Sequence, residues 1–327
     1  MSAALSIAQQ KLAALKLPSL GSVVRGTVLP LAGLLLLLVV WSIGAKQVVT
    51  SLGTLPGPAQ VWDQAGLLLT EHHEERAKAE AFYTRQDERN ATELAEDPTA
   101  EPSQRKYTGK PTFVDQIGTS LLTVMTGFLL ASLIAIPVGV AIGLSPTLYG
   151  MFNPVIQIFR PVSPLAWLPI VTLVVSAVYV SDDPAVSKSF LVSMLCVMLC
   201  SLWPTLVNTA VGASTVSSDL VNVSRVLRLN ALTHVFRVVL PSSVPMIFAG
   251  LRTSLGVAWM VLIASEMLAQ NPGLGKFVWD EFQNGSSSSL GRIMVAVVTI
   301  GVIGFALDRG MLLLQRSVSW DKTAALR

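Results

Sequence analysis

Six long apolar runs constrain the fold of this chain more than any other feature of its sequence. A helix needs about 20 predominantly apolar residues to cross the hydrocarbon core of a bilayer, and each run is close to that length or longer. The whole chain has a mean hydropathy of +0.60 and only 13% charged residues, which excludes an ordinary soluble domain. We therefore predict an all-α polytopic membrane protein with spans at about 28–45, 117–144, 154–180, 189–211, 244–268 and 292–314.

Basic residues between the spans predict the orientation of the chain. Cytosolic loops of membrane proteins carry an excess of Lys and Arg. The tails 1–27 and 316–327 and the loop 213–243 are basic on balance, whereas the loops on the other side are acidic. No convincing cleavage site follows the first run, so we interpret it as an uncleaved span. We expect both termini in the cytosol of a bacterium and the permease body at 28–315 in its inner membrane.

The hydrophilic segment 71–112 interrupts the spans on the predicted periplasmic side. Its first part, to about Glu96, is charged and poor in apolar residues, which fits a solvated helix. Its second part contains Pro98, Pro102, Gly109 and Pro111 and is predicted to be a loop. A solvated spacer and a docking surface for a periplasmic partner both fit this acidic insert. His72 and His73 have no third ligand at metal spacing, so we predict no metal site here.

A polar, basic stretch at 222–251 lies between two apolar runs. Its apolar residues recur at helical spacing before and after a break at 229–231. We predict two short amphipathic helices joined by a turn, with Pro241 near the start of the next span. The remaining faces carry Arg225, Arg228, Thr233, His234 and Arg237. A cytosolic surface of this kind indicates contact with a partner protein.

This stretch resembles the EAA motif of importer permeases of the ATP-binding-cassette class. In that motif E-A-A-x-x-x-G is followed, after a spacer, by a hydrophobic pair and Leu-Pro, which Val238-Val239-Leu240-Pro241 supplies here. The spacing places Arg228 where the family has Gly, and Gly is favoured where φ must be positive. The resemblance implies coupling to an ATPase through Ser224, Arg225, Arg228, Leu229, Asn230, His234, Arg237, Leu240 and Pro241.

Polar and aromatic side chains within the spans indicate where a pathway could run, because a charge at bilayer depth normally faces a protein-lined or wet interior. The segment that starts at Arg160 resembles the family's RP-x-P segment, and the one around Glu266 resembles its AAEML segment. The pathway candidates are Arg160, Ser163, Trp167, Arg252, Trp259 and Glu266.

Each of these candidates also has a structural interpretation. Arg160 could anchor its helix, and Arg252 could snorkel to the cytosolic boundary. Trp259 could simply pack between helices. Glu266 fits a role in holding a helix end or gating through hydrogen bonds better than contact with an anion, which its carboxylate would repel.

The resemblance implies the type I fold of these importers and a homodimer that works with two ATPase subunits and a periplasmic binding protein. The chain lacks G-x-x-x-x-G-K-[ST], since Gly273-Leu274-Gly275-Lys276 is followed by Phe277. ATP and Mg are therefore expected on the ATPase subunits, and this chain is predicted to be a transporter subunit without catalytic residues or cofactors. No basic run is interleaved with aromatic residues, so we predict no nucleic-acid partner.

The substrate is suggested by resemblance alone. The segment 271–289 resembles importer permeases assigned to nitrate, so we expect nitrate, with nitrite and cyanate as related possibilities. Bicarbonate and alkyl sulfonates such as taurine are alternatives within the same class. A membrane scaffold without a pathway is a remote alternative, because a scaffold would not need the EAA-like stretch.

Overall fold

The computed structural model describes residues 28–50, 53–97, 102, 105–180, 186–286 and 288–318. The expectations for the tail 1–27 and for residues 319–327 lie outside the described residues. The chain divides into two units, residues 1–63 and 64–327.

The first unit contains an apolar helix, α3 (Leu29–Gln47), in which Pro30 lies in the first turn, where its missing N–H is not needed. A short antiparallel pair follows, with β1 (Val49–Thr50) bonded to β2 (Gly53–Thr54). The helix α4 (Pro58–Glu96) begins in this unit and continues into the second. The structure confirms the predicted helix up to Glu96, and it shows that this helix already begins at Pro58.

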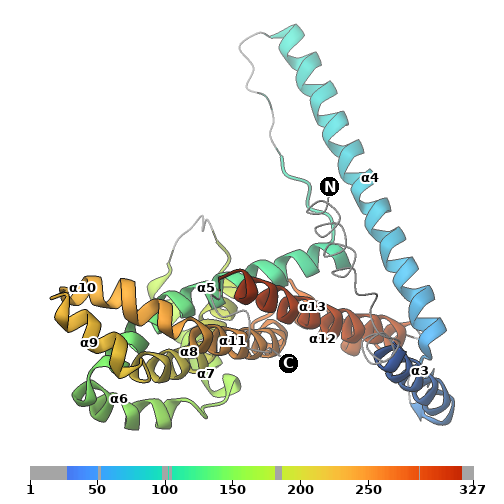
Figure 1. Ribbon diagram of the computed structural model, residues 1–327. Helices are drawn as coiled ribbons and strands as arrows, with labels where there is room; N and C mark the ends of the chain where they lie inside the picture. The colour runs from blue at the N-terminus through green and yellow to red at the C-terminus, as the bar shows by residue number, and fades with distance from the viewer. Residues whose placement is uncertain are drawn as a thin grey trace, which may run out of the picture. The chain divides into compact units, whose positions relative to one another are not determined.

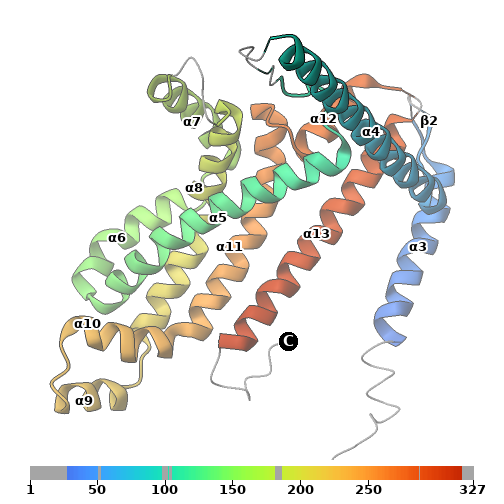
Figure 2. The ribbon, with the colours of Figure 1, turned by 90° about the horizontal axis from the view of Figure 1, so that it is seen from above.

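The second unit is built around three long helices, α5 (Phe113–Leu144), α8 (Lys188–Ser214) and α11 (Leu240–Ala269), which lie side by side in Figures 1 and 2. Glycines allow close approach between them. A Cβ atom on Gly139 of α5 would lie 2.8 Å from the carbonyl oxygen of Leu206 on α8. Small residues at helix contacts are typical of membrane bundles, where van der Waals packing drives association.

The third predicted span is broken, as its prolines suggest. It consists of α6 (Pro146–Phe159) and α7 (Pro164–Val178), which are bent by 99° at residues 160–163. Pro161 and Pro164 have no backbone N–H to continue a helix, which explains why the break falls here. The expectation that this span is not one regular helix is confirmed.

The remaining helices complete an all-α fold. Among the described residues, five helical stretches are long and apolar enough to cross a membrane, and the α6–α7 pair would make a sixth span. This agrees with six predicted spans. The other helices are α9 (Ser218–Val226), α10 (Ala231–His234), the π turn η2 (Val235–Val239), α12 (Leu274–Asn284) and α13 (Ser289–Val318).

Candidate functional site

The EAA-like stretch forms a compact corner at one end of the bundle, the end opposite to α12 (Figure 2). We call residues 218–239, which comprise α9, α10 and η2, the coupling surface. Two helical segments with a turn between them are confirmed. The second segment differs from the prediction in one respect, because it continues through η2 directly into α11 without a separate end.

The turn between the segments has the hydrogen bonds of a Schellman motif. The N–H of Leu229 donates to the carbonyl of Ser224 at 3.1 Å, and the N–H of Arg228 donates to the carbonyl of Arg225 at 3.0 Å. Arg228 has φ 49°, the left-handed conformation that this motif requires and that glycine usually supplies. Arg228 therefore keeps the backbone geometry of the motif glycine at a conformational cost.

Side chains hold the two segments of the coupling surface together. Ser224 is buried, and its Oγ lies 2.8 Å from Nδ1 of His234. Asn230 caps α10 by accepting from the N–H of Thr233 at 2.7 Å. Leu229, half-buried, lies in the turn between them. These predicted coupling residues fix the shape of the surface.

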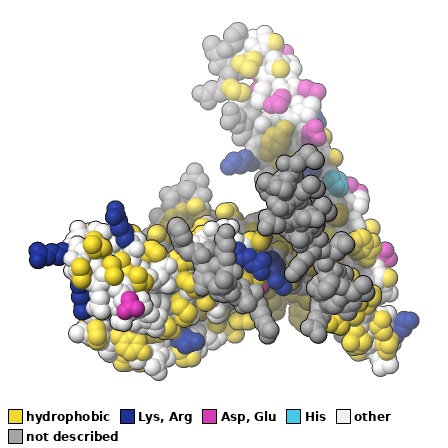
Figure 3. Space-filling model, in the orientation of Figure 1, with side chains coloured by type: hydrophobic (Ala, Val, Ile, Leu, Met, Phe, Trp, Pro, Cys, Tyr) yellow, Lys and Arg dark blue, Asp and Glu magenta, His cyan; other side chains and the backbone are white. Residues whose placement is uncertain are grey.

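The outer face of the coupling surface combines apolar and cationic side chains (Figure 3). Val226 is 81% exposed and Phe236 is 66% exposed, so this face leaves large apolar side chains uncovered. The guanidinium groups of Arg225, Arg228 and Arg237 are exposed and form no ion pairs among the described residues. The arrangement fits a partner with an apolar cleft and an acidic rim.

The end of the motif ties this surface to the bundle. Val239 is fully buried and packs with Val140 of α5 and Ala213 of α8, and Leu240 packs against the same cluster. Pro241, which is exposed, lies in the first turn of α11. A force applied to the coupling surface would therefore be transmitted to α5, α8 and α11.

Three pathway candidates lie at the bend between α6 and α7. Arg160 ends α6, is exposed and has no ion-pair partner among the described residues. Ser163 caps α7 by accepting from the N–H of Leu165 at 3.3 Å. Trp167 stacks on Phe159 with ring centroids 5.8 Å apart. Among the described residues, the bend thus carries a cation without an ion-pair partner and a pair of stacked aromatic rings.

Arg252 and Trp259 are held by α13. The guanidinium of Arg252 donates from Nε and Nη2 to both carboxylate oxygens of Asp308, with 2.9 Å between Nη2 and Oδ2. Nε1 of Trp259 donates to the carbonyl of Ile300 at 3.0 Å. The positive charge of Arg252 is therefore already balanced by Asp308.

Glu266 is fully buried where three helices meet. Both of its carboxylate oxygens accept from Oγ of Ser120 on α5, at 2.8 and 2.9 Å, and Oε2 also accepts from the N–H of Gly275 at 3.0 Å. The N–H of Leu274 donates to the same Ser120 hydroxyl at 2.9 Å. The N-cap residue of α12 supplies no side-chain cap. Ser120 and Glu266 instead accept from the free N–H groups in the first turn of α12, and the carboxylate complements the positive end of the helix dipole.

Sequence reasoning missed Asp308 and Ser120. Asp308 carried a usable signal, because an acid within an apolar span normally has a cationic partner. Ser120 carried none, since a serine in a span is ordinary. Among the described residues no group of three or more His, Cys, Asp or Glu side chains could hold a metal ion.

Residues 131–320 match the family described as binding-protein-dependent transport system inner membrane component. The chain is 38% identical over 204 residues to the nitrate import permease protein NrtB of Synechococcus elongatus, an alignment that covers 62% of this chain and 69% of the relative. It is 33% identical over 292 residues to the bicarbonate transport system permease protein CmpB of the same species, covering 89% of each.

A solved structure has a similar fold. An inward-facing form of the MetNI methionine ABC transporter superposes with a TM-score of 0.53 at 14% identity, over 63% of this chain and 95% of that chain. This match supports the importer permease architecture and carries no information on substrate.

Proposed function

This chain belongs to the family of inner-membrane components of binding-protein-dependent transport systems, and from that premise we propose that it is the permease through which such a system imports nitrate. The observation that carries the choice of nitrate is the similarity to NrtB. The chain is a transporter subunit and not an enzyme, so the substrate passes through it chemically unchanged.

Arg160, which has no ion-pair partner in the described part of the chain, supports a monovalent oxyanion as substrate. Nitrate carries one delocalised charge over three oxygens in a plane, and a guanidinium matches that geometry with two parallel N–H donors. Arg160 is exposed at the α6–α7 bend, whereas Arg252 is already neutralised by Asp308. We assign first contact with the anion to Arg160 and a structural role to Arg252.

Bicarbonate is the second candidate, and one observation favours it. The alignment with CmpB spans nearly the whole of both chains, whereas the alignment with NrtB covers a smaller part. Bicarbonate is also a planar monoanion with three oxygens, so the same guanidinium would recognise it. Anion geometry does not distinguish nitrate from bicarbonate here, so the transported substrate has to be determined by measurement.

The coupling surface supports drive by a separate ATPase. Its exposed apolar residues and three arginines, which form no ion pairs among the described residues, make a docking face, and its end is packed into the bundle through Val239. We assign this face to the cytosol, together with both termini, following the excess of basic residues. Two copies of the chain and two ATPase subunits, which bind ATP and Mg, would then form the transporter, with alternating access through rigid-body movement.

The test is the ATPase activity of the complete transporter in proteoliposomes with its binding protein. Nitrate, nitrite, cyanate, bicarbonate and taurine are added separately. We expect nitrate to stimulate hydrolysis at the lowest concentration. Stimulation by bicarbonate alone would overturn the nitrate proposal and keep the permease; no stimulation by any of the five anions would overturn substrate coupling for this group of anions.

Arg160→Ala then tests the binding role. Loss of a charge-assisted hydrogen bond costs about 1.5–3 kcal/mol, so the nitrate concentration for half-maximal stimulation should rise about tenfold or more. Arg160→Lys should recover part of the loss because it keeps the charge. Arg316→Ala, at the exposed end of α13, is the control and should leave the value unchanged; equal values in Arg160→Ala and wild type would contradict the assignment.

A further inference from the structure

The charged insert has a defined structure that is held together by its own internal contacts. We call α4 from Gln64 to Glu96, together with the returning segment 105–112, the arm. The hydroxyl of Tyr107 donates to Oε1 of Glu75 at 2.7 Å, and its N–H donates to the hydroxyl of Tyr83 at 3.2 Å. The N–H of Arg105 donates to Oε1 of Gln86 at 3.0 Å. The returning segment is therefore fastened along one face of the helix.

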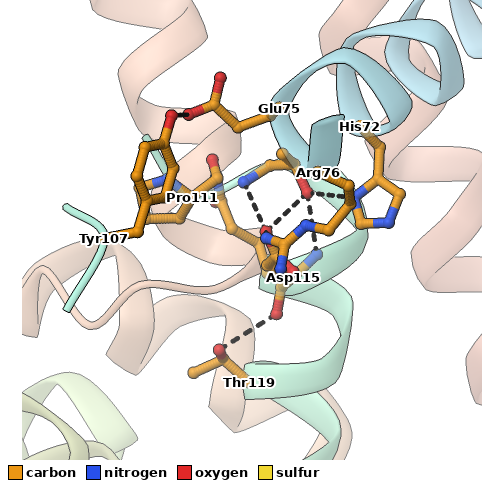
Figure 4. Close-up of polar contacts among 9 residues, drawn as sticks. His72, Glu75, Arg76, Tyr107, Pro111, Asp115 and Thr119 are labelled. Atoms are coloured by element: carbon orange, nitrogen blue, oxygen red, sulfur yellow. Dashed lines mark hydrogen bonds and ion pairs between the residues drawn. The ribbon is translucent and has the colours of Figure 1, made fainter. Parts of the chain in front are cut away.

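The base of the arm is fixed to the permease bundle. On one side Nη2 of Arg76 pairs with Oδ2 of Asp115 at 2.7 Å, and Nδ1 of His72 lies 2.7 Å from Oγ1 of Thr112, next to the start of α5 (Figure 4). Thr112 and Asp115 also form the capping box of α5. A lateral load on the arm would therefore reach the first turn of a membrane span.

A second attachment joins the base to α12 and α13. Arg292 of α13 forms a bidentate pair with Glu71 at 2.7 and 2.8 Å. The same guanidinium lies 2.7 Å from Oε1 of the buried Glu281 on α12. The base of the arm therefore contacts the start of α5 and α13 directly, and α12 through Arg292. Beyond these contacts it extends away from the bundle (Figure 1).

The far half of the arm gathers three arginines around one cavity, although Asp87, Glu88, Glu93 and Glu96 on the same stretch of α4 leave it without a net positive charge. A cavity of 360 Å³ is lined by Arg85, Arg89 and Arg105, with Phe82 at its wall and Glu93 as the one carboxylate among the described residues that line it. None of the three guanidinium groups forms an ion pair within the described part of the chain. Arg85 and Arg89 are four residues apart on one helix face, where like charges destabilise the helix. The three exposed guanidinium groups at this cavity are therefore open to carboxylates of a partner.

We propose that this arginine cluster is the docking site for an acidic surface of the substrate-binding protein, so that the arm determines which binding protein the permease accepts. The inference rests on the proposed function, because it requires a binding-protein-dependent importer with the arm on the periplasmic side. Guanidinium forks bind carboxylates with two parallel hydrogen bonds. Arg89 lies about 20 Å along the helix axis beyond Arg76, which favours a protein partner over a free anion on its way into the membrane.

The test is the affinity of the purified binding protein for the complete transporter in nanodiscs. Arg105→Glu and, separately, Arg89→Glu should each weaken binding about tenfold, mainly through slower association, and reduce its dependence on salt. Both side chains are exposed, so neither substitution disturbs a buried contact. Lys106→Glu is the matched control, because it makes the same charge change one residue away at an exposed side chain that does not line the cavity. It should stay within twofold of wild type.

Two results would overturn the proposal. One is an equal loss of affinity in Arg105→Glu and Lys106→Glu, which would indicate a general charge effect. The other is binding of inorganic sulfate at the cluster while the variants keep full affinity for the binding protein, which would make the cavity a small-anion site. Anion-stimulated ATPase activity of the wild type at saturating binding protein tests the transport function separately, so the two ideas can fail independently.

Discussion

Arg228 occupies the left-handed position of a Schellman motif, with φ 49°. An L-residue with a side chain pays roughly 1–2 kcal/mol for this conformation. We predict that Arg228→Gly raises the stability of the transporter by about 1 kcal/mol, measured as the free energy of unfolding in detergent. Arg225→Gly, within α9, is the control and should lower it by about 1 kcal/mol. Destabilisation by Arg228→Gly would show that the guanidinium itself contributes more than the backbone strain costs.

Glu266 connects three helices through one carboxylate. Glu266→Ala leaves the Ser120 hydroxyl and the Gly275 N–H without their acceptor, and each buried orphan costs about 1–3 kcal/mol. We predict a loss of about 2–4 kcal/mol in the free energy of unfolding. Glu266→Gln should lose less, because its amide oxygen can still accept from Gly275.

Ser265→Ala is the control for this prediction. Ser265 is a buried neighbour, and its hydroxyl donates to the carbonyl of Leu262, at 2.9 Å. Its removal should cost about 1 kcal/mol or less. If Glu266→Ala proved as stable as Ser265→Ala, the carboxylate would not be holding α12.

At the scale of elements, the hydrogen bond that joins the returning segment of the arm to α4 depends on pH. The hydrogen bond from Tyr107 lowers the pKa of Glu75 below its ordinary 4.5, and the same bond raises the pKa of Tyr107 above its ordinary 10.0. The stability that Glu75 contributes to the folded arm is present above pH 4.5 and is lost as pH falls through the lowered pKa of Glu75. The contribution from Tyr107 is present below pH 10.0 and is lost as pH rises through its raised pKa.

Tyrosinate absorbance tests this assignment. The difference between the titrations of wild type and Tyr107→Phe isolates one phenol, and we predict its midpoint above pH 10.0. In Glu75→Gln the midpoint should fall back towards the ordinary value, because the charged acceptor is gone. A midpoint at or below 10.0 in the wild type would mean that the bond between the returning segment and α4 does not persist in solution.

Most elements could be predicted from local patterns. The apolar runs identified the spans by length, and the prolines after Arg160 marked the α6–α7 break, because a missing N–H acts wherever it occurs. The continuity of η2 with α11 was not predicted, since the basic residues before Pro241 suggested a separate surface helix. One continuous helix can be apolar inside the bundle and amphipathic beyond it. Its sequence then shows an amphipathic stretch and an apolar stretch next to each other, which resemble two separate helices.

At the scale of the whole molecule, the candidate site could be predicted only in part. The residues of the coupling surface follow one another in the chain, so a motif could identify them. The pair Arg252–Asp308 and the contact of Glu266 with Ser120 join residues far apart in sequence. Side-chain identity alone does not determine such partners, because packing of α5, α11 and α13 selects them.

We predict that ATP hydrolysis on other subunits moves nitrate through this chain by way of the coupling surface. The direct measurement is accumulation of isotopically labelled nitrate by proteoliposomes that contain the complete transporter, its binding protein and ATP. We expect ATP-dependent accumulation in the wild type and its loss in the doubly charge-reversed variant Arg225→Glu/Arg237→Glu, with the complex still assembled at high salt, where the new like-charge repulsion is screened. Nitrate accumulation that is unaffected by this variant, or that proceeds without ATP, would contradict the central claim.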